Sequence, residues 1–178
     1  MNDQGVGHDD ASRVTDLPYR PCVGVVLFNR DGLVWVGQRC VRSDDNFTVA
    51  WQLPQGGIDD NEAPDVAAFR ELKEETGIDA AEIIAETENW LTYELPDHLI
   101  GVAWGGKYRG QKQKWFALRF LGDDHDFDLN THGTPEFSSW RWVPLVDLPD
   151  LIVAFKRGVY TQIVAAFSHL PEKVSSEQ

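Results

Sequence analysis

The stretch that most constrains this chain covers residues 56–78 and reads GGIDDNEAPDVAAFRELKEETGI. Side chains that favour helix starts come first, in the run Asp-Asp-Asn, and Pro64 suits a first helical turn. Gly77 suits the residue just past a helix end. The sequence therefore predicts a helix over roughly residues 63–76.

Three glutamates share one stripe of this predicted helix. At about 100° per residue, Glu75 lies about 40° to one side of Glu71, and Glu74 lies about 60° to the other side. Like charges at these separations repel each other, and a divalent cation would remove the repulsion. Hard oxygen ligands suit Mg2+ or Mn2+, and Mg2+ commonly binds through a few carboxylates together with substrate phosphates.

The same projection places Val66, Phe69 and Leu72 on the opposite side of the helix. We therefore expect the helix to bury that apolar face and to present the carboxylates on its exposed face. Small residues, Ala67 and Ala68, flank the carboxylate stripe and would let the glycine loop before the helix approach it closely.

Length and composition set further limits. A chain of 178 residues with 42% hydrophobic residues suits one well-packed domain. No apolar run approaches the 18 or so residues of a membrane span, and the first residues lack a signal-peptide core, so we expect a cytoplasmic protein with no membrane partner. Cys22 and Cys40 lack CxxC spacing, which argues against zinc and a disulfide framework and indicates buried or half-buried thiols. The histidines show no metal-like spacing.

The formal net charge of −13 disfavours strong nonspecific binding to nucleic acid, because such affinity comes mostly from cationic surface. The cations are unevenly spread, however, and five of the sixteen fall within residues 107–119. We therefore expect the protein to recognise a phosphate-rich terminus and to make little contact with a long nucleic acid. DNA is not an expected partner.

Strand and turn patterns surround the helix. Residues 22–29 read as a buried strand, 29–32 as a hairpin turn and 33–39 as the partner strand. Further strands are predicted at 81–85, 89–95, 111–120 and 140–143, with a turn joining the first two. A C-terminal helix is expected within 147–169, with Val153, Tyr160, Val164 and Phe167 at helical spacing.

The domain organisation is expected to be simple. Residues 1–17 are predicted to be a disordered tail, 18–170 one domain, and 171–178 a flexible tail. The polar loop at 41–50 precedes the carboxylate stretch, and either a lid or an inert surface loop fits its composition.

Residues 56–78 fill every defined position of the Nudix box, namely a glycine, five residues, a glutamate, seven residues, Arg-Glu, an aliphatic residue, any residue, Glu-Glu, any residue, Gly and an aliphatic residue. The chain therefore resembles a Nudix hydrolase. Segments outside the box, such as YRPCVGVVLFN, NWLTYELP, GQKQKWFALRF and AFKRGVY, are similar to those of bacterial RNA pyrophosphohydrolases and of diadenosine tetraphosphate hydrolases of plant and bacterial type. The resemblance implies an α+β fold in which a mixed β-sheet lies between helices, an α/β/α sandwich.

The resemblance implies Mg2+-dependent hydrolysis, and it leaves the substrate open. The whole chain favours release of pyrophosphate from the 5′-triphosphate end of RNA, which would place the protein in messenger RNA decay. Residues 101–114 favour the alternative, cleavage of diadenosine tetraphosphate to ATP and AMP. A third hypothesis is a binding module without catalysis, but such a module would be expected to lack box glutamates, and all are present. The oligomeric state stays open, with a monomer favoured.

The resemblance also implies a catalytic and metal-binding set. Arg70 would orient a carboxylate through a bidentate pair, although an ordinary helix ion pair is the alternative. Glu62 would be a further ligand or support one, unless it only stabilises the helix start. Either Glu71 or Glu136 would be the general base. The set comprises Gly56, through its carbonyl, and Arg70, Glu71, Glu74, Glu75 and Glu136, with Mg2+, Mn2+ or another divalent cation as cofactor.

Substrate contacts implied by the resemblance are more scattered. Cations would contact phosphates, while Tyr93 or Phe155 would stack on a base. The alternatives are that the two lysines near residue 113 only solvate a strand edge and that Phe155 belongs to the core. The set comprises Arg20, Arg39, Tyr93, Lys112, Lys114, Phe155 and Lys156.

Overall fold

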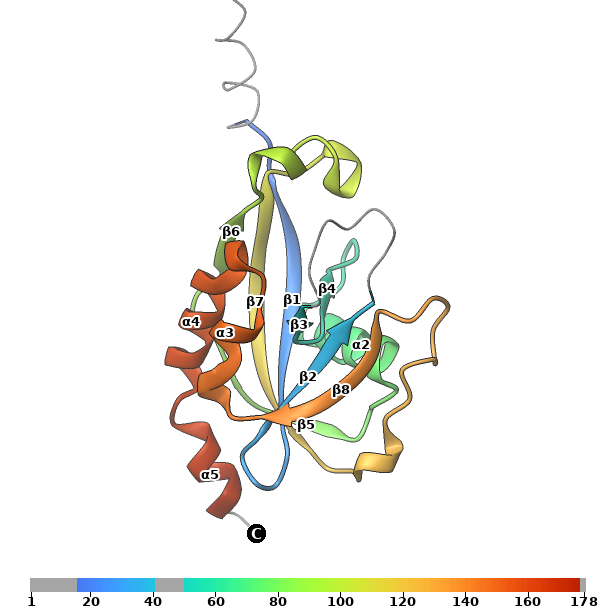
Figure 1. Cartoon of the computed structure of the whole chain (residues 1–178), viewed down its shortest axis with the longest axis vertical. Helices are drawn as coiled ribbons and strands as arrows, with labels where there is room; N and C mark the ends of the chain where they lie inside the picture. Colours follow the sequence, from blue (N-terminus) through green and yellow to red (C-terminus); the bar gives the residue numbers. More distant parts are fainter. Residues whose placement is uncertain (1–15, 41–49, 177–178) are drawn as a thin grey trace, which may run out of the picture.

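The computed structural model describes residues 16–40 and 50–176. Within this part of the chain a mixed sheet of eight strands has helices on both sides, which is the expected layered α+β arrangement (Figure 1). Its strands are β1 (Tyr19–Phe28), β2 (Val34–Arg39), β3 (Trp51–Gln52), β4 (Gln55–Gly57), β5 (Ala81–Glu86), β6 (Leu91–Glu94), β7 (Gly110–Phe120) and β8 (Phe137–Val143). The helices are α2 (Pro64–Thr76), α3 (Leu148–Leu151), α4 (Arg157–Phe167) and α5 (Leu170–Ser176). Short 3-10 turns are η1 (Asp97–Leu99), η2 (Ala103–Gly106), η3 (Asp124–Asp126), η4 (Leu145–Asp147) and η5 (Ala154–Lys156).

Strand β1 organises the sheet. One of its edges pairs in parallel with β7 over its whole length. Its other edge is shared, because β4 pairs with Cys22–Gly24 and β2 meets β1 only where Phe28 lies opposite Val34. Beyond that point β2 pairs with β3 and β8. The predicted hairpin turn is present, since Asn29 Oδ1 accepts hydrogen bonds from two turn N–H groups, but its strands separate and leave room for the glycines of β4.

Two cores lie on opposite faces of the sheet. One contains Trp115 and Tyr160 and packs the sheet against α3, α4 and α5, whereas the other contains Trp35 and Leu72 and packs it against α2. The first core requires a glycine at position 24 of β1, because a Cβ there would lie 2.3 Å from the Trp115 ring. The two halves of the polypeptide meet where β1 and β7 run side by side.

The C-terminal region differs from the prediction. The single helix expected within 147–169 is interrupted, because Ile152 and Val153 have extended backbones with ψ of 158° and 143°. Tyr160 and Phe167 face the core as expected, but Val153 lies between the helices. Residues 171–176 are not a flexible tail, since α5 forms there and buries Val174.

Other predictions have mixed outcomes. The two strands expected around the turn after α2 both form, but β5 and β6 pair with β7 and not with each other. Cys22 is buried and Cys40 half-buried, as expected. None of the helices in the described ranges is both long enough and apolar enough to cross a membrane. Apart from residues 16, 17 and 50, the predicted disordered tail at 1–17 and the loop at 41–50 lie outside the described residues.

Candidate functional site

Helix α2 begins and ends where the sequence predicts. Pro64 occupies its first turn, and Gly77 closes it with a left-handed φ of 80° while its N–H donates to the Lys73 carbonyl. Before the helix, the Asp59 N–H donates to Glu62 Oε2 over 2.9 Å. This bond ties the loop after β4 to the helix start.

The predicted burial pattern of the helix is right for Leu72 and wrong for Val66 and Phe69. The residues that α2 buries are Ala67, Ala68, Leu72 and Thr76, whereas Val66 is 56% exposed and Phe69 only half-buried. With Glu71 at 0°, the buried residues span about −40° to about 140°, and Glu75 at about 40° lies near the middle of that arc. The two alanines let the helix approach the sheet closely, so α2 turns Glu71 and Glu75 toward β4. Burying the larger apolar residues would have turned these carboxylates away.

The close approach depends on Gly56. A Cβ at this position would lie about 2.1 Å from both carboxylate oxygens of Glu71. Only glycine therefore fits between β1 and the carboxylate. The Glu71 side chain is 12% exposed, and its burial raises its pKa despite the nearby Arg70 guanidinium.

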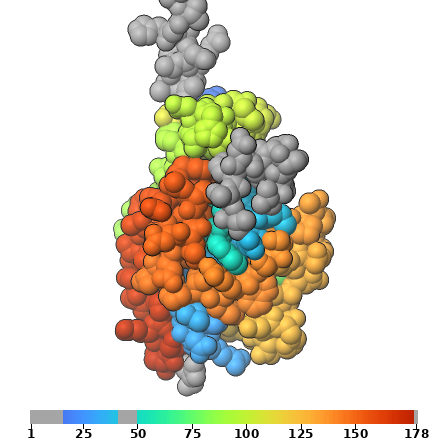
Figure 2. Space-filling view, in the orientation of Figure 1, coloured from blue at the N-terminus to red at the C-terminus, as the bar shows by residue number. Residues whose placement is uncertain are grey.

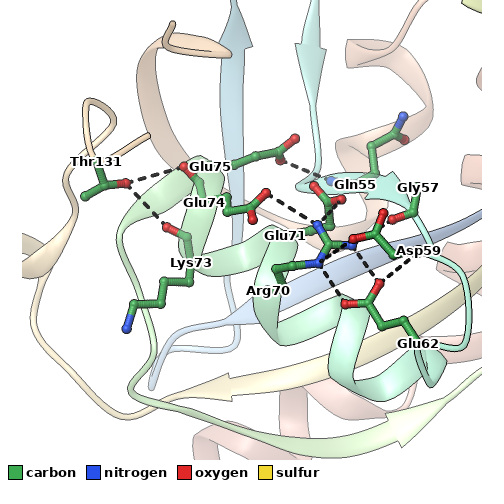
Figure 3. Close-up of polar contacts among 10 residues, drawn as sticks. All are labelled: Gln55, Gly57, Asp59, Glu62, Arg70, Glu71, Lys73, Glu74, Glu75 and Thr131. Atoms are coloured by element: carbon green, nitrogen blue, oxygen red, sulfur yellow. Dashed lines mark hydrogen bonds and ion pairs between the residues drawn. The ribbon is translucent and has the colours of Figure 1, made fainter. Parts of the chain in front are cut away.

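Arg70 joins the loop and the carboxylates into one unit (Figure 3). Its Nε donates to Glu62 over 2.7 Å, and its Nη2 donates to Glu62 and to the Gly57 carbonyl, each over 2.8 Å. Its Nη1 donates to Glu71 over 2.8 Å and to Glu74 over 3.4 Å. The guanidinium therefore orients carboxylates as predicted, and its hydrogen bonds lower the pKa of Glu62 to about 2.

Glu75 is in a different situation. Its Oε2 accepts a hydrogen bond from the Gln55 N–H over 3.1 Å. Burial raises its pKa well above the usual value, and repulsion from Glu71 and Glu136 adds to this. A charged Glu75 is therefore unfavourable without a nearby cation.

These residues fit a divalent cation. Glu71 and Glu75 offer only hard oxygen donors to one cavity, and the glycine at position 56 keeps that space open. In the described ranges, no group of three or more His, Cys, Asp or Glu side chains is already arranged to coordinate a metal ion. Here Arg70 holds Glu71 and Glu74 while Glu75 bonds to backbone, so an ion would compete with these contacts.

The carboxylates open into a cavity of about 340 Å³. Its lining combines acidic, basic and amide side chains with an aromatic ring and two glycines. These residues are Arg20, Arg39, Gln52, Gln55, Gly56, Gly57, Glu71, Glu75, Trp104, Gln111, Glu136 and Lys156. Among the predicted metal-linked and catalytic residues, Gly56, Glu71, Glu75 and Glu136 therefore come together, whereas Arg70 and Glu74 on α2 do not line the cavity.

The cavity also contains cations. Lys156 is 7% exposed, and its Nζ donates to Gln52 Oε1 over 3.2 Å. Burial lowers the pKa of Lys156 to about 8, with a contribution from the nearby Arg39 charge. Arg39 itself pairs with Glu136 over 3.2 Å. Arg20 also lines the cavity, so three of the cations for which the resemblance implies phosphate contact lie together there.

The other predicted substrate contacts do not line the cavity. Tyr93 and Phe155 pack against each other with ring centroids 5.7 Å apart, and Tyr93 lies 5.5 Å below the Lys156 ammonium. They therefore support Lys156 and belong to the core or its edge. This placement agrees with the alternative considered for Phe155.

Lys112 and Lys114 point away from the cavity because side chains alternate along β7, and Gln111 has the opposite parity. Lys112 lies over the Trp90 ring at 5.6 Å. Lys114 donates to the backbone carbonyl of Thr87. The structure thus places both lysines on the other face of the sheet.

Sequence reasoning missed several cavity residues. Gln111 is buried in the polar half of β7, and buried glutamines in a strand are a usable signal because they need partners. Gln52 and Gln55 precede the two glycines, outside the box pattern. Trp104 lies in a glycine-containing loop, and nothing local predicts that the fold carries it to the carboxylates.

Comparisons with known proteins cover most of the chain. A family model described as NUDIX domain matches residues 18–163. Over 160 residues the chain is 56% identical to the RNA pyrophosphohydrolase of Mesorhizobium japonicum, covering 86% of this chain and 92% of that protein. It is 53% identical to the RNA pyrophosphohydrolase of Brucella ovis, covering 86% and 90%.

Solved structures resemble the fold. An Ap4A hydrolase binary complex from C. elegans has a TM-score of 0.58 at 21% identity, with 84% of this chain and 98% of that chain covered. The E. coli dihydroneopterin triphosphate pyrophosphohydrolase has a TM-score of 0.58 at 24% identity, with 83% and 98% covered. At these identities the likeness concerns the fold alone, and it confirms the predicted α+β architecture.

Proposed function

The chain belongs to the Nudix family of hydrolases, and on that premise we propose that it removes pyrophosphate from the 5′-triphosphate end of RNA, leaving a 5′-monophosphate. The observation that carries this proposal is the single cavity in which the α2 carboxylates face Arg20, Arg39 and Lys156. Relatives at 53% and 56% identity that are named RNA pyrophosphohydrolase support it. We also propose that the monomer is the active form.

Nudix enzymes generally use divalent cations, and we propose Mg2+ here, with Mn2+ as a substitute. Glu71, Glu75 and Glu136 would hold it, with Glu74 and the Gly56 carbonyl as further donors. When bound, such an ion neutralises phosphate charge and lowers the pKa of a coordinated water.

The chain's own residues perform the remaining tasks. Arg20, Arg39 and Lys156 hold phosphate oxygens, which fixes the reacting phosphorus relative to α2. The oxygen of a water molecule bonds to phosphorus while the phosphoanhydride bond to the departing pyrophosphate breaks, and a carboxylate takes the water's proton. Glu71 and Glu136 both line the cavity, and each is paired with an arginine, so both are candidates for this base.

A second candidate function is cleavage of diadenosine tetraphosphate to ATP and AMP. The segment 101–114, which favoured this reaction at the sequence level, supplies Trp104 and Gln111 to the cavity. An aromatic ring and an amide at the cavity wall suit a nucleoside as well as an RNA end.

A direct competition tests the two functions. The full chain is given Mg2+ and equal concentrations of 5′-triphosphate RNA and diadenosine tetraphosphate, and both products are followed in one time course. We expect RNA ends to be converted first, and both reactions to stop in Glu71→Gln and after chelation. Consumption of the dinucleotide while RNA ends stay triphosphorylated would reject the RNA proposal in favour of the second candidate.

A further inference from the structure

The segment between β6 and β7 holds an aromatic residue in an unusual backbone conformation. Trp104 has a φ of 52° and a ψ of 36°, in the left-handed region, and Gly105 beside it has a φ of 68°. Gly101 and Gly106 are also left-handed. Glycine adopts such angles freely. Tryptophan adopts them only at a cost in conformational free energy, so contacts with the surrounding structure must hold it in this conformation. Residues held this way cluster at binding sites, which makes Trp104 a candidate.

The position of the ring supports this. Segment 97–108 lies at the upper end of the described body, over the ends of β1 and β7 (Figures 1 and 2). Trp104 is half-buried and lines the same cavity as Glu71 and Lys156. Tyr108 braces it from the same loop, with ring centroids 6.5 Å apart and planes at 69°.

Arg20 connects this ring to the carboxylates. Its Cζ lies 5.7 Å from the centroid of the Trp104 ring. Nη2 of the same guanidinium group lies 2.5 Å from the point where a Cβ on Gly57 would stand, next to the glycine that faces Glu71. One guanidinium group therefore lies close to both the indole ring and the glycine loop beside Glu71, and all four line the same cavity.

We propose that Trp104 is a stacking platform for the base of the 5′-terminal nucleotide, an inference that rests on the proposed RNA function. Stacking on an indole accepts every base, because each base has a π face. The platform would therefore select a nucleotide-bearing polyphosphate over an inorganic one without reading sequence. It also gives a strongly acidic protein an uncharged means of holding an RNA end.

The test uses two RNAs with identical 5′-triphosphates, one of them abasic at the first nucleotide. For the normal RNA we expect Trp104→Ala to raise KM about tenfold, within the range of base–aromatic stacking, while kcat changes little. Trp104→Phe should recover most of the loss, whereas Trp104→Leu should not. For the abasic RNA, wild type and Trp104→Ala should have the same KM. Val102→Ala is the matched control, because Val102 is in the same loop, is 71% exposed and does not line the cavity.

Two results would overturn the proposal. An unchanged KM of Trp104→Ala for normal RNA would show that the ring contributes no binding. An equal rise for normal and abasic RNA would show that Trp104 acts through Arg20 and not through a base. If wild type cleaves only diadenosine tetraphosphate, the RNA function is rejected. The stacking role is then tested with the dinucleotide: a KM raised by Trp104→Leu but not by Trp104→Phe would support it, and a KM unchanged by Trp104→Leu would reject it.

Discussion

The two walls of the cavity are built in opposite ways. Among the described residues, most of the acidic wall comes from one short stretch, in which α2 supplies Glu71 and Glu75 beside the glycines of β4, and Glu136 is added from elsewhere. The basic wall is assembled from Arg20 on β1, Arg39 on β2 and Lys156 on η5. A local motif thus encodes the chemistry of the first wall, whereas only the topology of the sheet creates the second.

The walls also share one property. Each buries a charged group near like charges, so that burial, with like-charge repulsion added, raises the pKa of Glu75 and lowers that of Lys156. With the proposed ligands bound, a cation would stabilise the acidic wall and a polyphosphate the basic one, so the two ligands would complete the electrostatics that the protein leaves unbalanced. The predictions below separate the walls by asking which property each supports.

The largest expected effect is on the acidic wall. Glu75→Gln should lower kcat about a hundredfold to a thousandfold, since metal-based charge stabilisation is worth several kcal/mol. Its melting temperature in chelator at pH 8 should equal or exceed that of wild type. A carboxyl whose folded pKa is raised stabilises the fold below its unfolded pKa and loses that contribution as pH rises through the folded pKa. The advantage of Gln over Glu should therefore disappear as pH falls toward about 4.5.

Steady-state kinetics and thermal melts on the same preparations check this prediction. Glu86→Gln, on the exposed edge strand β5, is a control for removing a carboxylate elsewhere and should change neither quantity measurably. A Glu75→Gln variant that melts well below wild type in chelator would show that the charged carboxylate stabilises the fold.

The next effect concerns the phase of α2. Leu72 is fully buried, so Leu72→Ala should cost about 2–5 kcal/mol of unfolding free energy. Val66→Ala should cost no more than about 0.5 kcal/mol, because Val66 is mostly exposed. Denaturant unfolding measures both. Equal costs would contradict the orientation that brings Glu71 and Glu75 to the cavity.

This helix shows how far sequence reasoning reaches. Its bounds followed from Pro64 and Gly77, because caps and breakers act locally. Its phase did not follow, because hydrophobicity favoured burying Val66 and Phe69 while the fold buries two alanines to bring carboxylates close to β4. A functional site overrode the apolar pattern, and such sites are where pattern reasoning is expected to fail.

The basic wall shows the complementary limit. Arg20, Arg39 and Lys156 were predicted from family resemblance, and the cavity contains them. Nothing in the composition distinguishes them from Lys112, which resemblance also suggested. Lys112 is excluded from the cavity by its side-chain direction on β7. Lys156 reaches the cavity because the extended residues at 152–153 interrupt the predicted C-terminal helix just before it. Both features depend on long-range pairing.

A smaller effect is expected from pH on the basic wall. Lys156 is charged below its pKa of about 8 and loses its charge as pH rises through that value. The kcat/KM for 5′-triphosphate RNA reports the free enzyme and should fall up to about tenfold per pH unit above 8. Lys156→Arg keeps its charge and should remove this decline, although its activity will be lower because arginine does not match the lysine site. Profiles from pH 6.5 to 9.5 compare the two proteins, and parallel declines would assign the titration to another group.

The smallest effect separates cations inside the cavity from those outside it. Lys112 lies over the exposed Trp90 ring on the other face of β7, so Lys112→Ala should change KM for a two-nucleotide 5′-triphosphate RNA less than about twofold. Arg20→Ala removes a cavity cation and should raise that KM about tenfold or more. Repeating both measurements with a longer RNA gives the decisive contrast. If Lys112→Ala weakens binding of the longer RNA in a salt-dependent way, this face of the sheet contacts nucleotides beyond the 5′ end. If KM for the longer RNA is unchanged, recognition is limited to the terminus, as the net charge of −13 predicts.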